Sequence, residues 1–188
     1  MTLSPCPPIS NADWPAEIAV HREGFAGALN VYRTMAHHPA LLEAWAPLRQ
    51  HIVKKNTLGP ELTEVVILRA GLRMGAAYEW AHHVSRALAL GFSEHRINAI
   101  RGNPEGVDGL IVNAVDALFD ERRLTLEQEA ELAEAIGRKA VIDLIAMVGF
   151  YSVLGYLLNT YETPIDDNIQ KEAQTMPALF SLAPSSTG

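Results

Sequence analysis

Apolar residues recur every three or four positions along most of this chain, which is the spacing of one face of an α-helix. Alternating, valine-rich stretches typical of β-strands are missing, and Leu, Ala, Ile, Glu and Arg dominate the sequence. The pattern therefore predicts an all-α fold. The expected helices cover residues 16–36, 40–54, 62–72, 78–90, 94–100 and 108–120, a further stretch opened by Thr125, and residues 138–160.

Capping signals mark several ends of these helices. Gly75-Ala76-Ala77 is expected to kink or restart a helix, and Gly91 is a plausible C-cap. Ser93 is a plausible N-cap, and Thr125 followed three residues later by Gln128 predicts a capping box.

The length of 188 residues fits one domain with terminal extensions. Residues 1–15 are rich in Pro, Ser and Asn and are interpreted as an arm. Residues 16–168 form the expected helical domain, and residues 169–188 form a polar, proline-containing tail. Either extension could embrace a neighbouring subunit.

Charge and cysteine content restrict the possible partners. The formal net charge of -7 argues against nucleic acid and anionic membranes. The single cysteine, Cys6, allows no internal disulfide, and we find no signal-peptide pattern, so we expect a cytoplasmic protein. Residues 141–158 are strongly apolar but contain Asp143 and two glycines, which favours a buried or interface helix over a membrane span.

Three acid/base residues recur within residues 61–91. Glu79 and His83 are four positions apart, so a helix places them on one face, and Glu64 precedes them on the previous helix. An imidazole held with carboxylates against apolar surface is typical of a proton-transfer site. The alternative is a surface ion pair on a helix, which would stabilise the fold by only about 0.3 kcal/mol.

Around these residues the chain resembles the carboxymuconolactone decarboxylase family, which includes the alkylhydroperoxidase D-like proteins. The resemblance lies in LTEVVILR at 62–69, YEWAHH at 78–83, HHPALLEAW at 37–45 and the glycine at 91. It implies an alkylhydroperoxidase D-like helical bundle. Relative to the thiol branch of the family, Ala76 and Glu79 stand where the two redox cysteines would be, while Glu64 and His83 match the relay residues.

This resemblance implies a cofactor-independent lyase or isomerase that transfers protons on a small carboxylated or lactone substrate. His83 is the expected general acid/base, Glu79 its orienting partner, and Glu64 the second relay member. Tyr78, Trp80 and Arg69 are candidate substrate contacts, with Arg73 as a second choice for a substrate carboxylate. Core packing is the alternative for the two aromatic residues.

Two other functions stay open at this stage. One is an alkylhydroperoxidase-like antioxidant protein, which the absent cysteine pair disfavours because no thiolate could attack. The other is a non-catalytic, oligomeric ligand-binding protein. No metal-binding motif surrounds His82 and His83, so we predict no metal and no cofactor. The excess of apolar helix surface predicts a homo-oligomer, whether dimer, trimer or hexamer.

Overall fold

The computed structural model describes residues 4–182. All regular elements within these residues are helices, which confirms the predicted all-α fold. They are η1 Ala16–Ile18, α1 Ala19–Arg22, α2 Asn30–Met35, α3 Pro39–Gln50, the π-helical turn η2 His51–Lys55, α4 Gly59–Met74, α5 Ala77–Ala89, α6 Glu94–Ala99, α7 Gly106–Asp120, α8 Leu126–Ile136, α9 Arg138–Thr160, α10 Asp167–Ala173 and α11 Pro177–Phe180.

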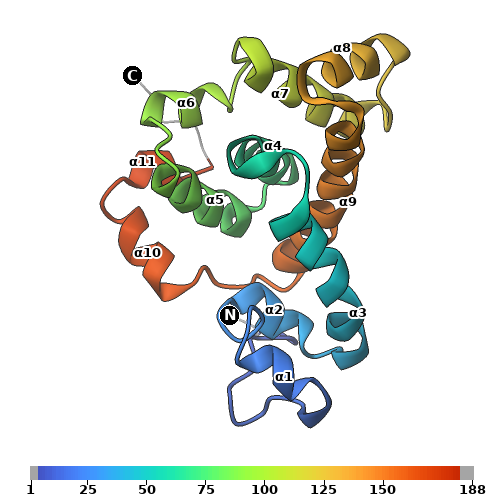
Figure 1. Ribbon diagram of the computed structural model, residues 1–188. Helices are drawn as coiled ribbons and strands as arrows, with labels where there is room; N and C mark the ends of the chain where they lie inside the picture. Colours follow the sequence, from blue (N-terminus) through green and yellow to red (C-terminus); the bar gives the residue numbers. More distant parts are fainter. Residues whose placement is uncertain (1–3, 183–188) are drawn as a thin grey trace.

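Helix α4 is the centre of the fold, with α5, α7 and α9 packed around it (Figure 1). Nine consecutive residues of α4, from Thr63 to Gly71, are buried. A helix that is buried nearly all round must contribute its polar side chains to internal networks. Glu64 and Arg69, both on this buried stretch, are therefore constrained by the core itself.

The junction between α4 and α5 follows the prediction at Gly75. This residue ends α4 with φ of 61°, a left-handed conformation that glycine adopts without steric penalty. Its amide and that of Ala76 bind back to the last turn of α4, and α5 then begins at Ala77. At Gly71 the two helices approach so closely that an added Cβ would lie 3.4 Å from Glu79 Cβ.

The N-caps predicted at Ser93 and Thr125 are confirmed. Ser93 caps α6 by accepting a hydrogen bond from the Arg96 amide at 3.1 Å. Thr125 and Gln128 form both hydrogen bonds of the capping box at the start of α8.

The single helix predicted for residues 16–36 is wrong. The structure has η1 and α1, a turn over residues 23–29, and then α2. The amides of Gly24 and Gly27 both donate to the carbonyl of His21, at 3.2 and 3.3 Å. A Cβ at Gly27 would lie 1.9 Å from the Arg22 carbonyl oxygen, so this turn requires glycine.

The terminal segments pack against the helices. In the arm, Arg33 Nη1 donates to the Ile9 carbonyl at 2.7 Å, and the Trp14 ring is buried. Within the expected tail, α11 lies between residues 177 and 180, and both α10 and α11 pack against α5. Residues 1–3 and 183–188 of the predicted arm and tail lie outside the described residues.

Helix α9 is the long apolar helix expected from the sequence. It is long and apolar enough to cross a membrane, yet 56% of its most apolar window is buried inside the fold. It packs on α4 and α8, and its Asp143 carboxylate accepts hydrogen bonds from the Thr57 amide at 2.7 Å and from the Thr57 hydroxyl at 2.8 Å. These contacts are those of a helix packed in the core, which agrees with the predicted buried or interface helix.

Candidate active site

Glu64, Glu79 and His83 lie together at the contact between α4 and α5. Glu64 Oε2 is 2.5 Å from His83 Nδ1, and Glu79 Oε2 is 3.4 Å from His83 Nε2. The side chains are almost entirely removed from solvent, with exposures of 7%, 4% and 2% for Glu64, Glu79 and His83. The imidazole therefore has a carboxylate at each ring nitrogen, and the closer one belongs to Glu64 rather than to Glu79.

This arrangement favours the protonated form of His83. Burial opposes the charged imidazolium, but the Glu64 carboxylate and the hydrogen bonds to both glutamates outweigh it, so the pKa of His83 is raised. A proton held between two carboxylates in a dry site is available for transfer to a third group.

Two buried tyrosine rings, Tyr32 and Tyr151, border the site together with His83. Tyr151 of α9 meets the His83 ring edge-on, with centroids 5.3 Å apart. Burial raises the pKa of Tyr151 well above its ordinary value and that of Tyr32 to about 12, so both rings stay neutral. The Tyr32 hydroxyl accepts a hydrogen bond from Arg49 Nε at 3.2 Å.

Two spaces border the site. The inner cavity, about 20 Å³, holds little more than one water molecule. The outer groove is open to solvent and measures about 520 Å³, enough for a small organic molecule. The inner cavity is lined in part by Tyr32, Tyr78, Glu79, His83, Arg86 and Tyr151, and the groove in part by Val53, Lys54, Pro60, Glu64, Arg86 and Leu90.

Arg86 lines both spaces, and sequence reasoning missed it. It lies three and seven residues after His83 and Glu79, which is the spacing of one helix face, so the same periodicity that linked the pair extends to it. That periodicity was the available signal.

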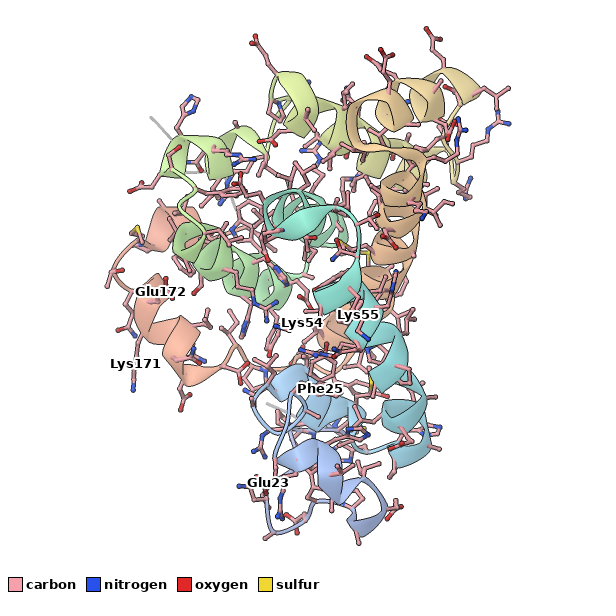
Figure 2. The ribbon with its side chains drawn as sticks, in the orientation of Figure 1. Glu23, Phe25, Lys54, Lys55, Lys171 and Glu172 are labelled. Carbon is pink, nitrogen blue, oxygen red and sulfur yellow. The ribbon has the colours of Figure 1, made fainter. Side chains whose placement is uncertain are left out.

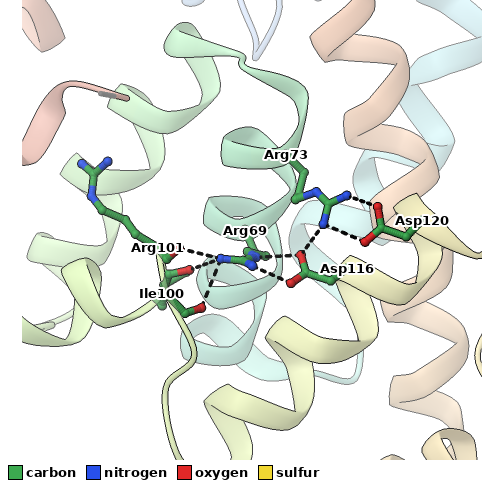
Figure 3. A network of polar contacts seen from close by, with 7 residues as sticks. Arg69, Arg73, Ile100, Arg101, Asp116 and Asp120 are labelled. Carbon is green, nitrogen blue, oxygen red and sulfur yellow. Dashed lines mark hydrogen bonds and ion pairs between the residues drawn. The ribbon is translucent and has the colours of Figure 1, made fainter. Parts of the chain in front are cut away.

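Arg69 does not reach either space. Its Nε lies 2.8 Å from Asp116 Oδ1, its Nη2 lies 2.5 Å from Asp116 Oδ2, and its Nη1 binds the carbonyls of residues 100–102 (Figure 3). Arg73 pairs with Asp116 and Asp120 beside it. Both guanidinium groups are occupied in linking α4 to α7, and neither lines the inner cavity or the outer groove, which argues against the expected substrate contact.

Trp80 is likewise structural. Its ring is fully buried, its Nε1 donates to the Leu179 carbonyl at 2.9 Å, and the Arg101 guanidinium lies 4.1 Å from its centroid. It anchors α11 to α5 and has no access to either space.

Tyr78 does line the inner cavity, but its hydroxyl is engaged with Asp166. His82 stacks on the Tyr78 ring, and its Nε2 lies 3.0 Å from Asp166 Oδ2. The two atoms are at ion-pair distance, but among residues 4–182 no acceptor meets hydrogen-bond geometry with His82 Nε2. Asp166 also accepts from the Asn30 amide at 3.1 Å, so this cluster fastens the segment before α10 to α2 and α5.

Among residues 4–182, no three His, Cys, Asp or Glu side chains are grouped so that they could hold a metal ion. Cys6, the single cysteine of the sequence, lies in the N-terminal arm. The carboxylates and the imidazole assembled at the site can hold, donate and accept protons, and Arg86 can attract an anion.

Comparisons with known proteins agree with this architecture. Residues 39–118 match the model of the carboxymuconolactone decarboxylase family. A Cys-to-Ala variant of the debrominase Bmp8 in complex with 2,3,4-tribromopyrrole has a similar structure, with a TM-score of 0.74 at 19% sequence identity, over 92% of this chain and 97% of that one. The debrominase without ligand gives a TM-score of 0.68 at 17% identity, over 93% of this chain and 96% of that one. No curated protein sequence matches this chain.

Proposed function

We propose that this chain, in which residues 39–118 match the model of the carboxymuconolactone decarboxylase family, is a cofactor-independent lyase or isomerase of small organic acids or lactones. The observation that carries the proposal is the buried contact of 2.5 Å between Glu64 and His83, with Glu79 at the other ring nitrogen. These three residues are the acid/base unit of the proposed reaction.

The positions of Glu64, His83 and Glu79 relative to the outer groove suggest a role for each. Glu64 lines the substrate-sized groove, so its carboxylate is the member that meets the substrate. His83 lies behind Glu64 and supplies or stores the proton, and Glu79 stabilises the imidazolium from the other side. This refines the expectation from sequence, in which Glu79 was the main partner of His83.

The proposed chemistry needs no external electron carrier. In a decarboxylation β to a carbonyl, the bond between the α-carbon and the carboxylate breaks, carbon dioxide leaves, and the electron pair passes into the carbonyl to form an enolate. The acid/base unit then delivers a proton to that carbon. In a double-bond shift, the same unit removes a proton from one carbon and returns it to another.

The thiol-dependent alternative is disfavoured by the covalent chemistry available. A dithiol peroxidase needs two cysteines near the relay, whereas this chain has one, in the N-terminal arm. A non-catalytic ligand-binding protein is the other alternative, and it would use the same groove without proton transfer.

The test is a hydrogen-exchange assay in heavy water with a panel of β-keto acids and unsaturated carboxylated lactones, followed by proton NMR and carbon dioxide release. 2,3,4-Tribromopyrrole, the ligand of the similar debrominase structure, is included as a probe. Wild-type protein is expected to exchange or decarboxylate at least one compound. Glu64→Gln and His83→Asn are expected to slow it by about 100-fold or more.

Glu61→Gln and His95→Asn are the matched controls, since both side chains are exposed and outside the groove lining. Glu61 lies one turn before Glu64 on α4, and His95 lies on α6. They should leave the rate unchanged. Full turnover by folded His83→Asn protein would reject the assignment. Turnover of a hydroperoxide with a dithiol, lost in Cys6→Ser, would favour the thiol-dependent alternative instead.

Composition also supports a proposal about the biological setting. We propose that the protein acts in the cytoplasm on a small molecule, without nucleic acid or membrane partners. The formal net charge of -7 and the single cysteine support this setting.

A further inference from the structure

Arg86 is half-buried, and its guanidinium has no protein partner among residues 4–182. It makes no hydrogen bond or ion pair with any residue in the described range 4–182, although its side chain lines two spaces. Arg69, on the adjacent helix, shows the contrast, since it is bound to Asp116 and to three carbonyls. A guanidinium carries five N–H donors, and leaving them unused in a partly dry site costs free energy.

The surroundings keep this arginine charged. Burial lowers its pKa, but Tyr151 and the Glu64 and Glu79 carboxylates outweigh that effect, and the pKa of Arg86 is raised. Neither carboxylate forms an ion pair with it, because Glu64 and Glu79 are both directed to His83. Arg86 is thus a permanent cation whose donors are free for a ligand.

A second arginine with free donors lies on the same inner cavity. Arg49 is 9% exposed and uses only Nε, in its bond to Tyr32, while its terminal nitrogens bind nothing within residues 4–182. Its guanidinium carbon lies 4.2 Å from the centroid of the Phe25 ring, which fixes the plane of the group. Arg49 and Arg86 therefore both line the inner cavity.

The outer groove in front of Arg86 has a matching character. Val53, Pro60, Ala89 and Leu90 give it apolar walls, and Lys54 of η2, labelled in Figure 2, also lines it. Lys54 adds a second positive charge to a mostly apolar groove. A ligand that fits this combination has an apolar body and one negatively charged end.

We propose that Arg86 is the anion-recognition residue of this site and that it binds the carboxylate of a small apolar organic acid lying in the groove. The proposal has two parts. Only the second part, that the bound acid is presented to Glu64 for proton transfer, rests on the proposed function. Anion binding by Arg86 stands without that step. The assignment moves the carboxylate contact from Arg69, where the sequence suggested it, to the next helix.

The test is binding of benzoate, with benzamide as its uncharged counterpart, to wild-type protein by calorimetry and by NMR of the arginine side-chain Nε–H signals. Benzoate is expected to bind and to shift the Arg86 signal, while benzamide binds at least about tenfold more weakly. Arg86→Gln should weaken benzoate binding by about tenfold or more, and Arg86→Lys should lose less, because it keeps the charge.

Arg138→Gln is the matched control. It removes the same charge from an exposed arginine at the start of α9, paired there with Glu129, and should leave benzoate binding unchanged. Equal binding of benzoate and benzamide, or wild-type benzoate affinity in Arg86→Gln, would overturn the proposal. Failure of benzoate to bind wild-type protein at all would do the same.

Failure of the proposed function gives a different result. If His83→Asn and Glu64→Gln keep benzoate binding and no compound exchanges protons with wild-type protein, then Arg86 remains the anion site of a binding protein. If exchange occurs and depends on His83 while Arg86→Gln retains both benzoate affinity and KM, the acid/base assignment stands and the anion assignment falls.

Discussion

At the scale of single residues, the protonation of His83 is the property on which the site depends. Its pKa is raised although burial opposes its charge, because the Glu64 and Glu79 carboxylates act on it from both sides. Removing the closer carboxylate leaves burial and the nearby Arg86 to dominate. We therefore expect Glu64→Gln to lower the pKa of His83, measured by NMR titration of the imidazole signals.

The same shift predicts how stability changes with pH. A group whose pKa is raised in the folded state stabilises the fold fully below its ordinary value, here 6.5, and that contribution disappears as the pH rises through the folded-state pKa. His83→Asn should remove this part of the pH dependence. Glu61→Gln, on the exposed side of the first turn of α4, is the control and should leave the His83 titration unchanged. An unchanged pKa in Glu64→Gln would contradict the account.

Spacing along one helix could be read from the sequence, but contacts between helices could not. The Glu79–His83 pair follows from a separation of four residues on α5, whereas the closer Glu64–His83 contact depends on the packing of α4 against α5. Arg69 looked free because its partner Asp116 lies 47 positions later in the chain. The sequence around Arg86 does not show that its guanidinium lacks a partner, because that depends on which side chains the other helices bring near it.

At the scale of elements, the break at Gly75 determines whether α4 and α5 can face one another. Its φ of 61° is unfavourable for any residue with a Cβ, while the space around it is open, so Gly75→Ala adds backbone strain without a clash. We expect a loss of about 1–2 kcal/mol in the free energy of unfolding, measured by urea denaturation.

Gly102→Ala is the control for that measurement. Gly102 does not have a positive φ, and a Cβ there would lie 3.7 Å from the Ala99 carbonyl oxygen, which is an ordinary contact. The stability of this variant should stay within about 0.5 kcal/mol of wild type. Equal effects of the two substitutions would show that the left-handed conformation at Gly75 is not what the fold requires.

The elements also show where sequence patterns stop being informative. Strong local signals, such as Gly75, Ser93 and the Thr125 capping box, gave correct boundaries because their chemistry involves only neighbouring residues. The helix expected over 16–36 failed because apolar spacing continued through a turn that two glycine amides close on His21. The helices α10 and α11 were missed because their stability comes from packing on α5, for example through Trp80 and the Leu179 carbonyl.

At the scale of the whole molecule, one face of α9 is unexplained by the fold of a single chain. Ile142 and Tyr156 are 63% and 65% exposed, and Ile145 and Val153 lie between them on the same side of the helix. The stripe carries no charge, and at its middle the exposed Gly149 has open space around it. Helix α9 also carries Tyr151, on its buried side, against His83.

The homo-oligomer expected from the sequence stays a prediction, and this stripe is where we place it. A two-fold interface pairs a surface with its own copy, so an uncharged, apolar stripe with a small residue at its centre is self-complementary. Light scattering of wild-type protein should show more than one subunit, and Ile142→Glu with Tyr156→Glu should give monomers. Leu126→Glu, at an equally apolar but isolated position that is 90% exposed on α8, should leave the mass unchanged. A folded wild-type monomer at micromolar concentration would mean that the stripe has no partner copy, and the groove beside Arg86 would then have to act within one chain.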